Sequence, residues 1–168
     1  MEPDHSTFMK AALEYAQGAL DNGEFPVGCV IVNNGKIIGG GARRNSKGDS
    51  ENEVDHAEIV VLRDILDSGE EHDLSGAVLY STMEPCLMCY ATMILSGIRN
   101  IVYGYEDVMS GGCSLDLASL PPLYAGMNVT ITPGVEREKC LEMFKKFFDD
   151  AENEYWNDSL LSQYTLDQ

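Results

Sequence analysis

Two cysteines stand three positions apart, directly after a proline, in the stretch MEPCLMC at residues 83–89. Pro85 suits the first turn of a helix, where its missing N–H would be unpaired in any case. Cys86 and Cys89 would then share one face of that helix, and its N-terminus would favour the thiolate form that metals bind. The pair could hold a catalytic metal ion, form a redox dithiol or belong to a structural zinc site.

A histidine and a glutamate elsewhere in the chain add to this pair. Of the three histidines, His5 lies near the N-terminus and His72 in the acidic run EEHD, whereas His56 stands at the expected start of another helix. Ala57 and Glu58 follow it directly. His56 could therefore supply a third metal ligand, and Glu58 a general base beside it.

This residue set favours a catalytic zinc ion over the two alternatives. A redox CxxC motif has no need of the HAE triplet, and a structural zinc site would use four protein ligands. The other cysteines, Cys29, Cys113 and Cys140, are each isolated and are expected to be small buried apolar residues. Three ligands leave a position for water, whose pKa zinc lowers to about 7. Attack by this water, with Glu58 protonating the departing nitrogen, would replace an amino group on an aromatic ring.

The periodicity of apolar residues predicts alternating strands and helices around these motifs. Helices are expected over 6–22, from Val54 or Asp55 to Ser68, from Pro85 to Ser96 and over 136–148; strands are expected over 26–32, 36–42, 77–82, 101–105 and 128–132. The turn at 33–35 joins the first two strands as a hairpin. This order predicts an α/β sandwich with a mixed sheet, whose antiparallel edge is the hairpin.

Length and composition indicate one globular domain spanning residues 1–168. No apolar run approaches the roughly 20 residues of a membrane span, and the N-terminus lacks the features of a secretory signal, so we expect a cytoplasmic protein. The 11 basic and 28 acidic residues give a net charge of −17. Because nucleic-acid affinity depends on neutralising phosphates, this balance disfavours an RNA or DNA substrate.

The two halves of the metal motif together resemble the signature of the zinc-dependent nucleobase deaminases, H-x-E followed by P-C-x-x-C. Here they read His56-Ala57-Glu58 and Pro85-Cys86-Leu87-Met88-Cys89. The chain is similar to the cytidine-deaminase-like superfamily over nearly all of its length. The resemblance implies a three-layer α/β/α sandwich with about five strands in its mixed sheet, one zinc ion per chain and a homodimer.

The same resemblance implies contacts with the substrate. Asn45 stands eleven residues before His56, where relatives carry an asparagine that bonds the base. Ala57 and Glu84 belong to or adjoin the two halves of the motif and are expected to contact the substrate as well.

Two branches of the superfamily share features with this chain. The stretches GIRNIVYGYED, GGCSLD and AGMNVTITPGVEREKC resemble the bacterial tRNA wobble-adenosine deaminases, whose C-terminal tails are basic. The ending FFDDAENEYWNDSLLSQYTLDQ instead resembles the fungal-type cytosine deaminases, in which an aromatic residue and an aspartate close over the free base. Tyr155 and Asp158 fall at these two positions, and Trp156 is a second candidate for the aromatic one. Met109 departs from that branch, which carries an aromatic residue there.

These observations predict a zinc-dependent hydrolytic deaminase of a small nucleobase or nucleoside, with free cytosine as the first candidate. The C-terminal helices, residues 136–168, are expected to cover the active site. A tRNA-specific wobble-adenosine deaminase is the main alternative, followed by a guanine deaminase and by an inactive zinc-stabilised binding module.

Overall fold

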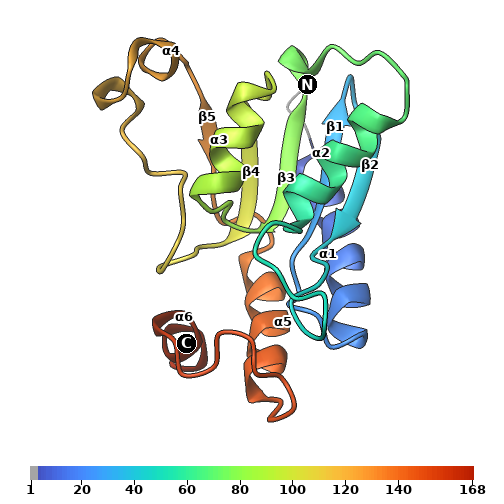
Figure 1. Cartoon of the computed structure of the whole chain (residues 1–168), viewed down its shortest axis with the longest axis vertical. Coiled ribbons are helices and arrows are strands. Elements are labelled where there is room, and N and C mark those ends of the chain that lie inside the picture. The colour runs from blue at the N-terminus through green and yellow to red at the C-terminus, as the bar shows by residue number, and fades with distance from the viewer. Residues whose placement is uncertain (1–3) are drawn as a thin grey trace.

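The computed structural model describes residues 4–168, which contain a five-stranded mixed sheet. The strands are β1 (Gly28–Asn33), β2 (Lys36–Ala42), β3 (Val78–Met83), β4 (Asn100–Tyr105) and β5 (Thr130–Thr132). They lie in the order β2-β1-β3-β4-β5, with antiparallel pairing from β2 to β3 and parallel pairing from β3 to β5 (Figure 1). The mixed sheet with its antiparallel hairpin confirms the predicted fold class.

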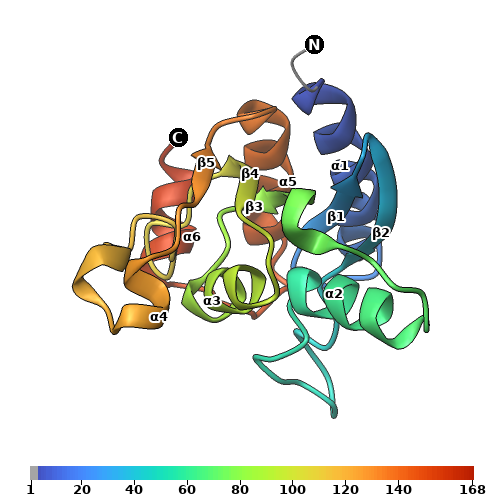
Figure 2. The same ribbon diagram turned by 90° about the horizontal axis from the view of Figure 1, so that it is seen from above.

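Helices cover both faces of this sheet. The α-helices are α1 (His5–Asp21), α2 (Ala57–Asp67), α3 (Leu87–Leu95), α4 (Pro122–Ala125), α5 (Arg137–Asp149) and α6 (Leu160–Leu166), and two short 3-10 helices span Leu74–Gly76 and Leu117–Ser119. Figure 2 shows α1 and α5 on one face of the sheet and α2 and α3 on the other, so the layers are those of an α/β/α sandwich. No helix within residues 4–168 is both long enough and apolar enough to cross a membrane.

Glycine residues serve a tight turn and a close helix–strand contact near the start of the sheet. Asn34 and Gly35 have φ angles of 49° and 73°, the left-handed conformation that the tight turn between β1 and β2 requires. Gly28 begins β1 directly against α1, where an added Cβ atom would lie 2.2 Å from the carbonyl oxygen of Ala12. Only glycine lets β1 and α1 pack at this distance.

An aromatic cluster joins α5 to the chain that follows it. The ring of Phe25 lies 5.3 Å from that of Phe144, 5.2 Å from that of Phe147 and 5.1 Å from that of Tyr155. Such aromatic pairs contribute about 0.5–1.5 kcal/mol each beyond the area that they bury. The cluster therefore anchors the segment between α5 and α6, which includes Tyr155, to the body of the sandwich.

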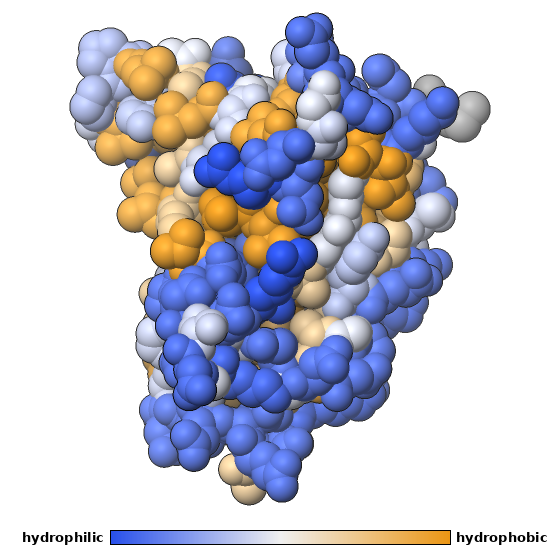
Figure 3. Space-filling model, turned by 45° about the vertical axis from the view of Figure 1, so that its right-hand side comes forward, coloured by the Kyte–Doolittle hydropathy of each residue, from blue (hydrophilic) through white to orange (hydrophobic). Residues whose placement is uncertain are grey.

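The face of the molecule shown in Figure 3 has two regions of different character. Figure 3 shows mainly hydrophilic residues over its lower half, at the level of α5, α6 and the loop between β2 and α2. Apolar side chains gather over the upper half in the same view. The chain from Asp149 onward has six acidic residues and no basic one.

The second helix begins later than the sequence predicts. It starts at Ala57 rather than at Val54 or Asp55, because the side-chain oxygen of Asn52 accepts hydrogen bonds of 2.9 Å from both of those backbone amides and holds them in a turn. His56 is consequently an extended N-cap residue with φ −63° and ψ 150°. The short helix α4 is not among the predicted elements, because its few residues carry no clear apolar period, whereas α6 lies within the C-terminal helices predicted over 136–168.

Candidate metal centre and active site

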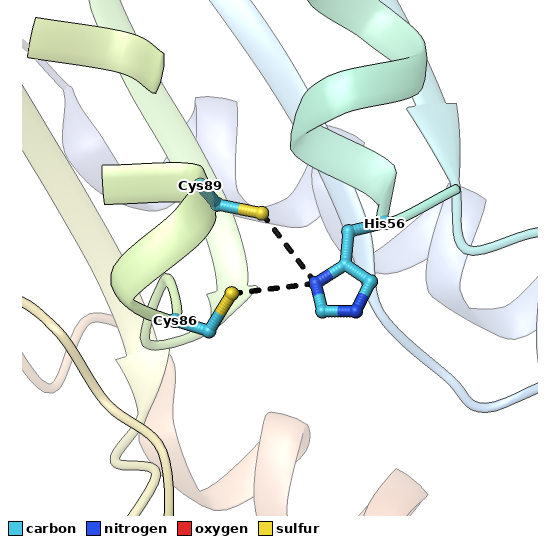
Figure 4. A group of neighbouring side chains, drawn as sticks. All are labelled: His56, Cys86 and Cys89. Carbon is cyan, nitrogen blue, oxygen red and sulfur yellow. Dashed lines mark hydrogen bonds between the residues drawn. The ribbon is translucent and has the colours of Figure 1, made fainter. Parts of the chain in front are cut away.

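The N-terminal ends of α2 and α3 bring the three predicted ligand residues together. His56 caps α2 and Cys86 caps α3, both with extended backbone, while Cys89 lies in the first turn of α3. Figure 4 shows the three side chains pointing toward one another. Nδ1 of His56 lies 3.5 Å from the Sγ atom of each cysteine, and all three ligand atoms are within 4.8 Å of one another.

This spacing fits a tetrahedral zinc ion. With Zn–S and Zn–N bonds of about 2.3 and 2.0 Å, a sulfur and a nitrogen ligand at the tetrahedral angle would lie about 3.5 Å apart. The two measured sulfur–nitrogen distances of 3.5 Å agree with that value. The cluster consists of one histidine and two cysteines. Three protein ligands with one open position are typical of catalytic rather than structural zinc sites.

The electrostatic environment of the two thiols favours a bound cation. Hydrogen bonding from Cys89, together with that from His56, lowers the pKa of Cys86 to about 4. The neighbouring Cys86 sulfur raises the pKa of Cys89, and burial raises it further. A cation between the two sulfurs would offset the repulsion that opposes a second thiolate, so the pair suits a thiolate-binding metal such as zinc.

Glu58 lies in the first turn of α2 beside this cluster. The residue is 3% exposed, and the Ser81 hydroxyl on β3 donates a hydrogen bond of 3.1 Å to its Oε1 atom. Burial raises the pKa of Glu58 above its ordinary value. A carboxyl group with a raised pKa is suited to take up a proton and return it near neutral pH.

A cavity of about 210 Å³ adjoins His56, Cys86 and Glu58. Its walls come from the residues just before β1, the loop between β2 and α2, the end of β3, the N-terminal ends of α2 and α3, the loop after β4, the segment between α5 and α6 and the start of α6. Apolar and aromatic side chains dominate this lining, and a few polar groups converge on it. Such a mixture is typical of pockets that bind small aromatic groups.

Glu84 holds the loop that follows β4 in place. Its carboxylate accepts hydrogen bonds from the backbone amides of Asp107 over 3.1 Å and of Cys113 over 3.2 Å. A Cβ atom on Gly111 would lie 2.5 Å from this carboxylate, so glycine is needed there. Burial raises the pKa of Glu84. Glu84 thus positions the loop that carries Met109 to the cavity, and its own carboxylate oxygens are engaged by backbone amides.

The structure brings three of the five expected substrate contacts to the cavity. Ala57, Glu84 and Tyr155 line it. Asn45 and Asp158 are not among the residues that line it in the described part of the chain.

Local backbone geometry explains why these two side chains lie elsewhere. Asn45 has a φ of 54°, and its side-chain amide donates a 2.7 Å hydrogen bond to Asp55, so it shapes the loop before α2. Asp158 is exposed, with a φ of 57°, and its carbonyl oxygen accepts a 3.1 Å hydrogen bond from the Gln163 side chain on α6. In this structure neither side chain lines the cavity, and a role of Asn45 and Asp158 in substrate binding stays a prediction.

Sequence reasoning missed Arg43, which also lines the cavity. This arginine is only 3% exposed, because its guanidinium donates to the backbone carbonyls of Asn52 over 2.6 Å, of Asp55 over 3.2 Å and of Arg44. It therefore organises the loop that leads to His56. The run ARRNSKGD contains no pattern that would distinguish a buried arginine from a solvated one.

Residues 2–105 match the family described as the cytidine and deoxycytidylate deaminase zinc-binding region. The chain belongs to this zinc-dependent deaminase family. The matched region includes His56, Glu58, Cys86 and Cys89. The protein is accordingly a hydrolytic deaminase with zinc as its cofactor, as the sequence analysis predicted.

Individual deaminases are similar to this chain over most of its length. It is 39% identical over 150 residues to tRNA-specific adenosine deaminase 2 of Danio rerio, a match that covers 84% of this chain and 69% of that protein. It is 34% identical over 142 residues to the tRNA-specific adenosine deaminase of Bacillus subtilis, which covers 84% and 86%. A solved structure from studies of A-to-I editing by tRNA:A34 deaminases at the wobble position of transfer RNA superposes with a TM-score of 0.68 at 30% identity, covering 82% of this chain and 98% of that one.

Proposed function

We propose that this enzyme deaminates adenosine in tRNA, converting it with one water molecule to inosine and ammonia. The observation that carries the proposal is the similarity to tRNA-specific adenosine deaminases from a vertebrate and a bacterium over 84% of this chain. This proposal replaces free cytosine, the first candidate from the sequence, by the main alternative. The acidic C-terminal segment pointed to a free base, but the similarity over 84% of the chain supports a tRNA substrate more strongly.

The arrangement of side chains suggests a division of roles. His56, Cys86 and Cys89 would hold zinc, which when bound supplies a Lewis acid that activates water at neutral pH. Glu58 would take a proton from the attacking water and return it to the departing nitrogen, because its buried carboxyl group has the raised pKa that such a shuttle needs. The hydrogen bond from Ser81 would keep this carboxyl group in one orientation during both transfers.

The cavity could accept a nucleotide base that has left the base stack of an RNA. Enzymes that modify a base in RNA take the nucleotide out of the stack and hold it between aromatic or apolar side chains. Here Tyr155, Trp156 and Met109 line the cavity and could enclose an adenine ring. Trp156 is also 43% exposed, so it could contact a neighbouring nucleotide at the rim.

The net charge of −17 opposes the binding of RNA, since contacts with phosphates need basic side chains. Arg44 and Lys47 are exposed in the loop between β2 and α2, which borders the cavity. They are candidates for phosphate contacts beside the cavity. Two such contacts predict only a shallow fall of affinity with salt, with a slope of about −1.4 in a plot of log K against log salt concentration for a single strand.

A substrate panel tests the proposal. The zinc-loaded enzyme would be given an anticodon stem-loop RNA with adenosine at the wobble position, the same RNA with guanosine there, and free adenine, guanine, cytosine and cytidine. We expect ammonia and inosine from the adenosine RNA alone. Rapid ammonia release from free cytosine, with none from RNA, would refute the tRNA proposal and favour the first candidate from the sequence. The homodimer and the cytoplasmic location stay predictions, which light scattering and cell fractionation would test.

A further inference from the structure

Glu53, in the loop before α2, stands between the metal ligand His56 and the segment between α5 and α6. Its Oε2 atom lies 3.5 Å from Nε2 of His56 and accepts a 2.8 Å hydrogen bond from the hydroxyl of Tyr155. Nη2 of Arg43 lies 3.8 Å from the same oxygen. Two groups from the loop before α2 and one from the segment between α5 and α6 therefore meet at one carboxylate oxygen.

The Nε2 atom of His56, on the side of the ring away from the two sulfurs, needs a hydrogen-bond acceptor. Its Nδ1 atom faces the two sulfurs, so a neutral ring that binds zinc through Nδ1 carries its proton on Nε2. Nε2 is buried and has no hydrogen-bond partner among the described residues. The Glu53 oxygen at 3.5 Å is slightly beyond hydrogen-bonding distance. A small movement of either side chain would complete the carboxylate–histidine pair that commonly orients zinc-bound histidines.

Tyr155, at the other end of this arrangement, belongs to a segment with unusual backbone geometry. Trp156 and Asp158 have φ angles of 55° and 57°, in the left-handed region that residues other than glycine adopt only where surrounding contacts hold them. The contacts that hold this segment include the Tyr155–Glu53 hydrogen bond, the packing of Tyr155 on Phe25 and the guanidinium of Arg43 at 5.5 Å from the Tyr155 ring. The hydrogen bond to Glu53 is thus one of the contacts that hold Tyr155 and Trp156 beside the cavity.

We propose that Glu53 is a positioning residue that couples the metal ligand His56 to the segment of Tyr155 and Trp156. Its carboxylate would orient the His56 ring through Nε2 and hold Tyr155 at the rim of the cavity through the same oxygen. The occupied metal centre and the closed segment would then stabilise each other. This inference rests on the zinc site of the proposed function, but it does not depend on the identity of the substrate.

Zinc affinity and tryptophan fluorescence test the two ends of this coupling separately from activity. Trp156 is the single tryptophan of the chain, and its ring lies 5.6 Å from that of Tyr155, so its emission reports on this segment. We expect Glu53→Ala to weaken zinc binding by about 10-fold or more in competition with a chelator, the range found for lost carboxylate partners of zinc-bound histidines. Zinc addition should shift Trp156 emission in the wild-type protein and much less in Glu53→Ala.

Three further variants separate the coupling from a general structural effect. Glu53→Gln keeps an oxygen acceptor and should recover part of the zinc affinity. Tyr155→Phe removes only the hydroxyl and should abolish the zinc-dependent shift of Trp156 while it weakens zinc binding less than Glu53→Ala does, because the Glu53–His56 pair is intact. Glu51→Gln changes the charge of an exposed residue in the same loop and should behave like wild type in both assays.

The outcomes distinguish this inference from the proposed function. Wild-type zinc affinity in Glu53→Ala would overturn the coupling, as would an unchanged Trp156 response in both Glu53→Ala and Tyr155→Phe. A wild-type protein that binds no zinc would instead refute the metal centre on which the proposed function depends.

Discussion

Replacement of Glu58 by glutamine would separate the chemical role of this residue from its structural one. Glutamine has nearly the same shape and can still accept the 3.1 Å hydrogen bond from Ser81, but it cannot carry a proton. General acid–base catalysis contributes about 10²–10⁴-fold, and Glu58 would act in both directions of the transfer. We therefore expect Glu58→Gln to lower kcat about 10³-fold, which corresponds to about 4 kcal/mol at 1.36 kcal/mol per factor of ten.

The same substitution should raise the stability of the zinc-free protein at neutral pH, although it lowers kcat. Burial raises the pKa of Glu58 above the ordinary value of 4.5 that the unfolded chain would show. The contribution of this group to stability is then fully present below pH 4.5 and is lost as the pH rises through the folded-state pKa, where a buried charge must form. Glutamine never forms that charge. The melting temperature of Glu58→Gln should exceed that of wild type at and above neutral pH, and the difference should vanish in acid.

Three measurements on the same samples check this reasoning. They are kcat on the best substrate, zinc content by elemental analysis and melting temperature after chelation at several pH values. Glu142→Gln, an exposed change on α5, is the matched control. Loss of zinc from Glu58→Gln would make Glu58 a ligand instead of a proton shuttle. An unchanged kcat would refute the role of Glu58 as proton shuttle. A lower melting temperature at neutral pH would refute the argument that burial of its charge destabilises the protein.

Three other perturbations have defined outcomes. Cys86→Ala should lose both zinc and activity, because two ligands remain; elemental analysis and ammonia release check this, and full zinc content would contradict the ligand set. Gly111→Ala should displace the Glu84 carboxylate or the loop and destabilise the protein by about 1–3 kcal/mol in urea unfolding, as overpacking commonly does; an unchanged midpoint would contradict the close contact. Arg137 donates to both carboxylate oxygens of Glu106 over 2.8 and 2.6 Å and lowers the pKa of Glu106 to about 2. The stability from this pair is present above pH 4.5 and is lost as the pH falls toward 2. Arg137→Gln should thus cost about 1 kcal/mol at pH 7 and less at pH 3, and an equal loss at both pH values would contradict the pairing.

The metal centre could be predicted because its residues are specified locally. Pro85 lies two residues before the start of α3, close to the predicted start, and the spacing of Cys86 and Cys89 places both thiols at that end. His56 and Glu58 stand at another predicted helix start. The alternation of apolar strands and helices then brings such helix ends to one edge of the sheet, so few long-range details were needed.

The substrate cavity depends on long-range contacts that no sequence pattern shows. Arg43 is buried because backbone carbonyls of a distant part of its loop surround it, and Glu53 faces Tyr155 across 102 positions of sequence. Asn45 and Asp158 adopt left-handed backbone conformations that direct their side chains elsewhere. Net charge favoured a free base over the tRNA substrate that we propose, but composition describes the whole surface whereas recognition depends on the few groups around the cavity.

The most direct test of the central claim is the time course of inosine formation in an anticodon stem-loop that contains a single adenosine, at the wobble position. The account predicts that enzyme carrying one zinc ion per chain converts this adenosine with release of one ammonia per inosine, and that Glu58→Gln, with the same zinc content, does not. Equal rates for the two proteins, or no inosine from zinc-loaded enzyme that deaminates a free base, would contradict it.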